Sequence, residues 1–210
     1  MNFAIVPVTL FEQNCTILLC PQTNAAVVID PGGEPERITQ RLVGLDAKPV
    51  ALLLTHGHLD HVGGAVALAK TLKVPIQGPH QDDAFLLDAL PLQAQMFGLP
   101  HQTPFTPDAW LNDGDCVTFG EQTLDVLHCP GHAPGHVVFF HRASALAQVG
   151  DVLFYRSIGR TDLPQGDHAT LLRSIHQRLL PLGAQVRFIP GHGPMSTLGD
   201  EQQHNQFLRG

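Results

Sequence analysis

Three histidines and one aspartate fall within six residues of the segment "LLLTHGHLDHVGGA", residues 52–65. His56 and His58 are two residues apart, so their side chains point to the same side of an extended segment. Asp60 and His61 follow, and the flanking glycines let the backbone turn sharply. Imidazole and carboxylate groups are ligands that suit Zn²⁺. The spacing therefore predicts that His56 and His58 bind one metal ion and that Asp60 and His61 bind a neighbouring one.

Two metal ions need more ligands than this segment holds. Three further candidates each follow an apolar stretch and lie beside a glycine: His132 in "HCPGHAPGH", Asp151 in "QVGDVLF" and His192 in "IPGHGP". Taken singly, such an aspartate is more often a turn residue than a metal ligand, and such a histidine is as often a loop residue as a metal ligand. Together with the first segment they predict two divalent ions per chain, zinc first, with iron or manganese as alternatives.

The elements that would position these residues are short apolar strands with loops at their ends. Strands are expected at residues 3–10, 15–20, 25–30, 50–55, 74–78, 117–120, 123–128, 136–141, 145–154 and 185–192, and helices at 34–45, 62–72, 82–98 (broken near Pro91) and 167–180. Each half of the chain supplies strands and then helices, so two mixed sheets packed face to face with helices outside are expected. No linker divides the chain, which predicts a single α/β domain over residues 1–210.

Composition excludes several partners. The formal charge is −7, with twelve lysines and arginines and no basic run, which argues against a nucleic-acid surface. The apolar runs are too short to cross a bilayer, and the amino-terminal segment does not read as a signal peptide, so we expect a cytoplasmic protein. The four cysteines lack CxxC spacing and are expected to be free, buried thiols. The sequence leaves the oligomeric state open.

The motifs "THGHLDH", "PGHAPGH", "GD" and "PGHGP", in this order, resemble those of the metallo-β-lactamase superfamily. The resemblance covers nearly the whole chain and implies a four-layer αββα sandwich with a binuclear metal site between the sheets. It also implies seven metal ligands, which form a first triad, a second triad and a bridge: His56, His58 and His132; Asp60, His61 and His192; and Asp151.

Within that superfamily, "LTHGHLDHVGG", "HCPGHAPGHVVFF", "GRTDLPQGDH" and "FIPGHGPMSTLG" resemble glyoxalase II, the hydroxyacylglutathione hydrolases. The likeness is to a short bacterial form without the carboxy-terminal helical domain. It implies hydrolysis of a glutathione thioester such as S-D-lactoylglutathione by a metal-bridging hydroxide, with Asp60 as the catalytic residue that orients it. Arg160 corresponds to a basic glutathione contact; its other reading is an ion pair with Asp162. Pro194 stands where that family has a tyrosine.

Charge counting supports a small anionic thioester as the partner. Two divalent ions, two ligand carboxylates and one hydroxide leave the site about one unit positive. A thiolate is also a less basic leaving group than an amide nitrogen, so its protonation is less demanding. We assign His136 to a supporting role next to the metals and place neither His141 nor His168 in the site.

Other functions remain as alternatives. A glutathione persulfide dioxygenase with a single iron and a lactonase share the fold. β-Lactamases of this fold replace the bridging aspartate, whereas Asp151 is present here. A non-enzymatic zinc-binding structural or sensor domain is the last alternative, but structural zinc sites are usually closed and rich in cysteine. An open site with oxygen ligands favours the enzyme.

Overall fold

The structure is a computed structural model that describes residues 1–209. The first half of the chain forms a five-stranded mixed sheet. The strands lie in sequence order: β1 (Asn2–Val8), β2 (Gln13–Leu19), β3 (Ala25–Ile29), β4 (Lys48–Leu53) and β5 (Ile76–Gln77). The first three are antiparallel, and β3, β4 and β5 are parallel to one another.

The second half forms a six-stranded sheet in the order β13-β12-β9-β8-β7-β6. Its strands are β6 (Cys116–Phe119), β7 (Gln122–His128), β8 (Val137–His141), β9 (Leu146–Gly150), β12 (Arg187–Pro190) and β13 (Ser196–Thr197). Strands β9 and β12 are parallel and the other pairs are antiparallel. A separate two-stranded ribbon pairs β10 (Leu153–Phe154) with β11 (Ser157–Ile158).

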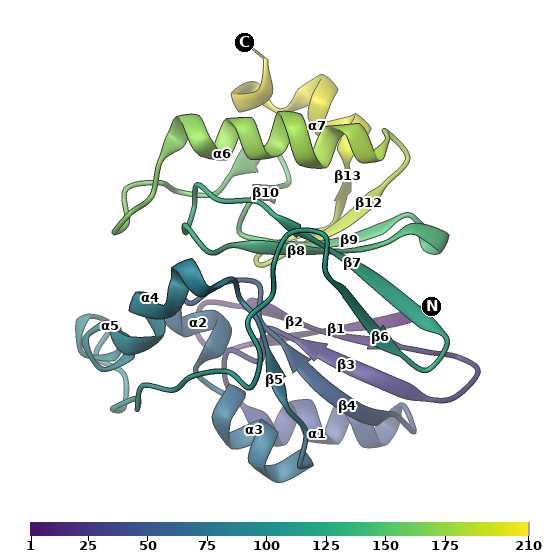
Figure 1. The fold of residues 1–210 in the computed structure, drawn as a ribbon, viewed down its shortest axis with the longest axis vertical. Coiled ribbons are helices and arrows are strands. Elements are labelled where there is room, and N and C mark those ends of the chain that lie inside the picture. The colour runs from purple at the N-terminus through teal and green to yellow at the C-terminus, as the bar shows by residue number, and fades with distance from the viewer. Residues whose placement is uncertain (210) are drawn as a thin grey trace.

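Helices cover the outer face of each sheet (Figure 1). The helices are α1 (Pro35–Gly44), α2 (Leu59–Val62), α3 (Ala65–Leu72), α4 (Ala84–Asp88), α5 (Leu90–Met96), α6 (His168–Ser174) and α7 (Leu198–His204). A π-helical turn (Ile175–Leu179) prolongs α6, and 3₁₀ turns span Gln81–Asp83, Arg142–Ser144, Leu180–Leu182 and Gln206–Leu208. Helices α1 and α3 lie on the first sheet, and α6 and α7 on the second.

Strand β4 shows how the sequence builds these layers. Leu52 and Leu54 belong to the apolar core under α1 and α3, whereas Ala51 and Leu53 belong to the core between the two sheets. A third apolar core lies between the second sheet and α6. Because both faces of β4 are covered, its sequence is a continuous apolar run instead of an alternating one. The expected four-layer αββα sandwich is confirmed.

Several predicted elements differ from the observed ones. The helix expected at 62–72 is found as α3, but it begins only at Ala65 and the short helix α2 precedes it. The two are separated where the Gly64 backbone N–H donates to the Pro31 carbonyl oxygen (2.9 Å), and a Cβ at Gly64 would lie 2.7 Å from that oxygen. The break expected near Pro91 is confirmed, since α4 ends at Asp88 and α5 begins at Leu90. The strand expected at 145–154 ends at Gly150. Strand β13 and helix α7 were not predicted.

The cysteines agree with expectation except at one position. All four are free thiols, and Cys15, Cys20 and Cys129 are buried. Cys116 is exposed at the start of the edge strand β6, so the expectation of a buried thiol is wrong there. None of the helices within residues 1–209 has both the length and the apolar character that a membrane crossing requires.

Candidate metal centre

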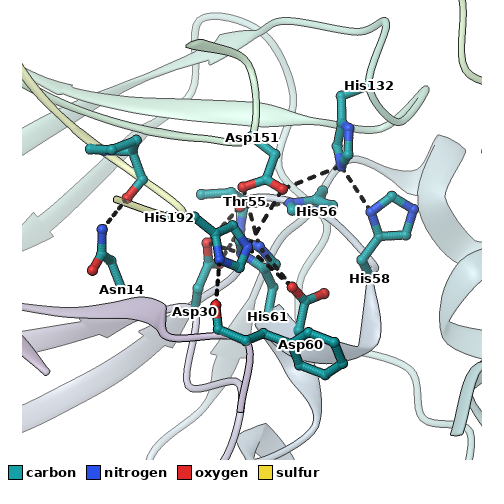
Figure 2. Close-up of polar contacts among 12 residues, drawn as sticks. Asn14, Asp30, Thr55, His56, His58, Asp60, His61, His132, Asp151 and His192 are labelled. Atoms are coloured by element: carbon teal, nitrogen blue, oxygen red, sulfur yellow. Dashed lines mark hydrogen bonds and ion pairs between the residues drawn. The ribbon is translucent and has the colours of Figure 1, made fainter. Parts of the chain in front are cut away.

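The structure brings all seven predicted ligands together at the loops that follow the strands (Figure 2). His56 and His58 follow β4, and Asp60 and His61 lie in α2. The other three come from the second half of the chain: His132 between β7 and β8, Asp151 after β9, and His192 after β12. The site therefore lies where loops of both sheets meet.

Three histidines form the first triad, His56, His58 and His132. One ring nitrogen from each lies within 4.8 Å of the others. His58 Nδ1 lies 2.9 Å from His132 Nε2, and the rings of His56 and His58 meet edge to face. His56 Nε2 is buried without a hydrogen-bond partner among the described residues. The three ring nitrogens therefore lie close enough together to share one metal ion.

The second triad is Asp60, His61 and His192. His192 Nε2 lies 3.1 Å from Asp60 Oδ2, and His61 Nε2 lies 3.8 Å from the same oxygen. Within residues 1–209, His61 Nε2 has no hydrogen-bond partner although it is fully buried. This triad has the composition of a second cation site.

Asp151 lies between the two triads, with one oxygen toward each. Its Oδ1 is 3.3 Å from His61 Nε2, and its Oδ2 is 3.6 Å from His132 Nε2. Figure 2 shows this carboxylate above the cluster, facing both sets of rings. A carboxylate placed in this way can serve two cations at once.

Asp30 holds two of the histidines in orientation, and the sequence analysis missed it. Its carboxylate accepts hydrogen bonds from His61 Nδ1 (2.9 Å), from the Thr55 hydroxyl (2.6 Å) and from the Thr55 backbone N–H (2.7 Å). Thr55 Oγ1 in turn lies 3.0 Å from His56 Nδ1. Because Nδ1 donates in both rings, each ring in its neutral form presents its Nε2 lone pair to the centre. The available signal was an aspartate directly after the buried strand "AAVVI".

The remaining histidine ligands are oriented by backbone carbonyls. His132 Nδ1 lies 2.8 Å from the Arg160 carbonyl oxygen, and His192 Nδ1 lies 3.0 Å from that of Phe11. Asn14, which the sequence analysis also missed, donates its amide to the carbonyls of Pro190 (3.0 Å) and Gly193 (2.8 Å) and thereby holds the loop of His192.

Arg160 and His136 lie near the site without facing its centre. The Arg160 side chain is 62% exposed and makes a bidentate ion pair with Asp162. This is the ion pair that the sequence analysis gave as the other role of Arg160. His136 is buried, stacks on His56 and accepts a hydrogen bond at Nε2 from the Asp151 backbone N–H (3.0 Å). His136 therefore supports the position of Asp151, as a residue behind the ligands would.

Electrostatics leaves His58 and Asp151 in their metal-binding forms and His61 protonated. Burial, with His132 nearby, lowers the pKa of His58 to about 3, so its imidazole is neutral at pH 7. Burial raises the pKa of Asp151, but the adjacent His61 outweighs it and holds that pKa well below its usual range. Burial lowers the pKa of His61, but Asp151 and Asp60 outweigh it and raise that pKa. Of these three groups only His61 holds a proton that a cation would have to displace.

The residues present fit a pair of divalent ions. His56 Nε2, His61 Nε2 and Asp151 Oδ1 are buried without hydrogen-bond partners in the described part of the chain. Leaving a buried polar group unsatisfied costs about 1–3 kcal/mol, and cations at the two triads would remove that cost. Imidazole and carboxylate donors suit zinc, iron and manganese alike.

Comparisons with known proteins agree with this fold. The family described as the Metallo-beta-lactamase superfamily matches residues 8–192. A Haemophilus influenzae protein named hydroxyacylglutathione hydrolase GloC is 48% identical over 209 residues, which cover 99% of this chain and 98% of that relative.

Two solved structures are similar over their full length. The BLEG-1 B3 metallo-beta-lactamase has a TM-score of 0.92 at 38% identity and covers 100% of both chains. The protein TTHA1623 in a di-iron-bound form has a TM-score of 0.88 at 38% identity, covering 98% of this chain and 100% of that one. With its sandwich fold, its converging ligands and a family match that ends at His192, this chain belongs to the metallo-β-lactamase superfamily.

Proposed function

We propose that this chain is a binuclear metallohydrolase of thioesters, with glutathione thioesters such as S-D-lactoylglutathione as its substrate class. The observation that carries the proposal is Asp151, whose two oxygens face two separate triads of ligand atoms. The relative named hydroxyacylglutathione hydrolase supports the thioester substrate. The free thiols are consistent with a reducing compartment such as the cytoplasm.

The chain's own residues divide the work of the reaction. Two divalent ions, when bound, would lower the pKa of a water molecule so that it can lose a proton and attack at neutral pH. The ions would also polarise the substrate carbonyl. Asp60 is partly exposed, unlike the fully buried His61, so its carboxylate can accept a hydrogen bond from the attacking water and orient it. The thiolate that leaves is a weak base, so its departure needs no strong acid from the protein.

Arg160 is proposed to bind the anionic part of the substrate. Its guanidinium is largely exposed, while its backbone carbonyl holds His132 of the first triad. A carboxylate of the substrate would have to compete with Asp162 for this side chain. Because both side chains of that ion pair are exposed, solvent screens their attraction and the pair exchanges easily.

A second candidate function is β-lactam hydrolysis, which a similar structure favours and the retained Asp151 disfavours. The BLEG-1 structure, titled a B3 metallo-beta-lactamase, is similar at 38% identity over both full chains. An attacking water and a polarised carbonyl would serve an amide as well as a thioester. The two candidates differ in the leaving group, because an amide nitrogen must be protonated as it departs.

The test is metal analysis coupled to turnover on one purified sample. We expect about two ions per chain after reconstitution with zinc, iron or manganese, and thiol release from S-D-lactoylglutathione that exceeds hydrolysis of a chromogenic β-lactam. Asp60→Ala should lower kcat/KM by at least about 100-fold, since a positioned proton acceptor contributes that much. Asp88→Ala, at an exposed aspartate of α4, is the control.

Three outcomes would contradict the proposal. Undiminished turnover in Asp60→Ala with full metal would remove the role given to Asp60. Oxygen uptake with glutathione persulfide, without thiol release from thioesters, would indicate the single-iron dioxygenase. Full metal and an intact fold with no turnover on any ester, lactone or thioester would indicate a structural or sensor domain.

A further inference from the structure

A cavity of about 270 Å³ opens directly beside Asp60. Apolar carbons make up most of its wall, from Phe11, Leu59, Ala67, Leu99 and Pro100. None of its lining residues is a lysine or an arginine, and its two acidic residues are Asp60 and Glu34. We call this cavity the side pocket. It has the character of a site for an uncharged, apolar group.

The side pocket is built into the second triad. Phe11, one of its walls, accepts the hydrogen bond that orients His192 through its backbone carbonyl (3.0 Å). Leu59, another wall, immediately precedes Asp60, and its backbone N–H is held by the Gln93 side chain (2.9 Å). The pocket is therefore positioned by the same contacts that position the metal ligands.

Part of the pocket is lined by backbone without side chains, which keeps it open. A Cβ at Gly32 would lie 1.6 Å from the Asp60 backbone carbonyl oxygen, so this part of the wall admits only glycine. The Phe11 ring is braced edge to face against Phe97, with centroids 5.3 Å apart. Segments from four separate parts of the chain, residues 9–11, 32–35, 59–67 and 99–102, contribute to the wall.

The two ends of the metal centre differ in polarity. The second triad adjoins the apolar side pocket through Asp60. At the first triad, His132 is held by the backbone carbonyl of Arg160, whose guanidinium is exposed. A substrate whose carbonyl lies by Asp151, between the triads, would have one substituent at each end. The charged substituent suits the Arg160 end and the apolar one suits the side pocket.

We propose that the side pocket binds the acyl chain of the thioester, and that the preferred substrates carry uncharged aliphatic acyl groups longer than lactoyl. This inference rests on the proposed thioesterase function and names its acyl specificity. Each additional methylene that enters the pocket should raise kcat/KM about fourfold until the pocket is full. An acyl group that ends in a carboxylate is repelled by the carboxylates of Asp60 and Glu34, so its longer chain does not raise kcat/KM.

The test is a series of thioesters that share one thiol. With glutathione as the thiol, we expect kcat/KM to rise by on the order of 100-fold from acetyl to hexanoyl. Succinyl, which has the same number of carbons as butyryl but adds a carboxylate, should fall below butyryl by tenfold or more. A flat series, or succinyl equal to butyryl, would overturn the proposal.

Two neighbouring positions of α3 give a matched pair of variants. Ala67 is exposed and lines the pocket, so Ala67→Phe places a ring in it. Val66 is exposed and lies outside the pocket lining, so Val66→Phe adds the same ring to the same helix without filling it. Ala67→Phe should lower the hexanoyl-to-acetyl ratio of kcat/KM at least tenfold, and Val66→Phe should leave that ratio unchanged. An unchanged ratio in Ala67→Phe would refute the assignment.

A binding measurement separates this inference from the proposed function. Calorimetry of the wild-type protein with hexanoate and with acetate needs no turnover. Tighter binding of hexanoate that is lost in Ala67→Phe supports the side pocket as an acyl site even if no thioester is hydrolysed. Equal binding of the two acids, or hexanoate binding that survives Ala67→Phe, overturns it even if thioesters are hydrolysed.

Discussion

Replacing Asp30 with asparagine tests whether hydrogen bonds behind the ligands prepare the metal centre. The carboxylate accepts three hydrogen bonds, two at Oδ2 from His61 Nδ1 and the Thr55 hydroxyl and one at Oδ1 from the Thr55 backbone. An asparagine has the same shape and tolerates the left-handed backbone found here, with φ of 51°. The substitution therefore changes the hydrogen bonding while keeping the fold.

The magnitude follows from counting acceptors. If the amide oxygen takes the place of Oδ2, the amide NH₂ faces the Thr55 N–H, and one hydrogen bond to a charged acceptor is lost. Such a bond is worth about 1.5–3 kcal/mol, so we expect the unfolding free energy of the metal-free protein to fall by about 2–3 kcal/mol. Loss of a partner behind a ligand typically lowers metal affinity or activity about 10–100-fold.

Two assays on the same preparations measure these effects. Urea unfolding in the presence of a chelator gives the change in stability, and competition with a chelator of known affinity gives the change in zinc binding. Asp46→Asn is the matched control, because Asp46 also has a left-handed backbone, with φ of 50°, and its carboxylate accepts one exposed hydrogen bond from Asn24. The control should change stability by less than about 0.5 kcal/mol.

One result would refute the reasoning. If Asp30→Asn binds zinc as tightly as the wild-type protein and unfolds at the same urea concentration, then Asp30 does not orient His61 and Thr55. The alignment of the Nε2 lone pairs would then have to come from packing alone.

Two further predictions concern protons. Burial raises the pKa of Asp83 to about 7, against about 3.9 in an unfolded chain, although the N–H groups of Gly135 and Gly57 oppose the rise. The folded state therefore binds this proton more tightly than the unfolded state does. The free energy of unfolding of the metal-free protein should fall by on the order of 2–4 kcal/mol as the pH rises from 4 through 7. Asp83→Asn should make the unfolding free energy, measured with urea, depend less on pH, and an equal pH dependence in variant and wild type would contradict the assignment. Metal binding at pH 7 should release protons from His61 and His192, since neighbouring carboxylates outweigh burial and raise both pKa values. Calorimetry in buffers of different ionisation enthalpy measures this release, and a binding enthalpy independent of the buffer would contradict it.

The ligand residues were predictable because their chemistry is visible in the chain. A cluster such as "HGHLDH" has few roles other than metal binding, and each later ligand follows an apolar strand beside a glycine. The layers were predictable for a related reason, since the continuous apolar run of β4 requires cover on both faces. Local composition and spacing carry this information.

The supporting residues and the side pocket depended on the tertiary structure. Asp30 reads in the sequence as an ordinary aspartate at a turn, and Asn14 as an ordinary residue of the turn between two strands. Their roles arise only when β3 brings Asp30 against Thr55 and His61, and when the start of β2 meets the loop of His192. The division of residues 59–72 into two helices was likewise decided by contact with the loop at Pro31. Such roles come from pairings between segments distant in the chain, and residue type and local spacing alone do not reveal which segments meet.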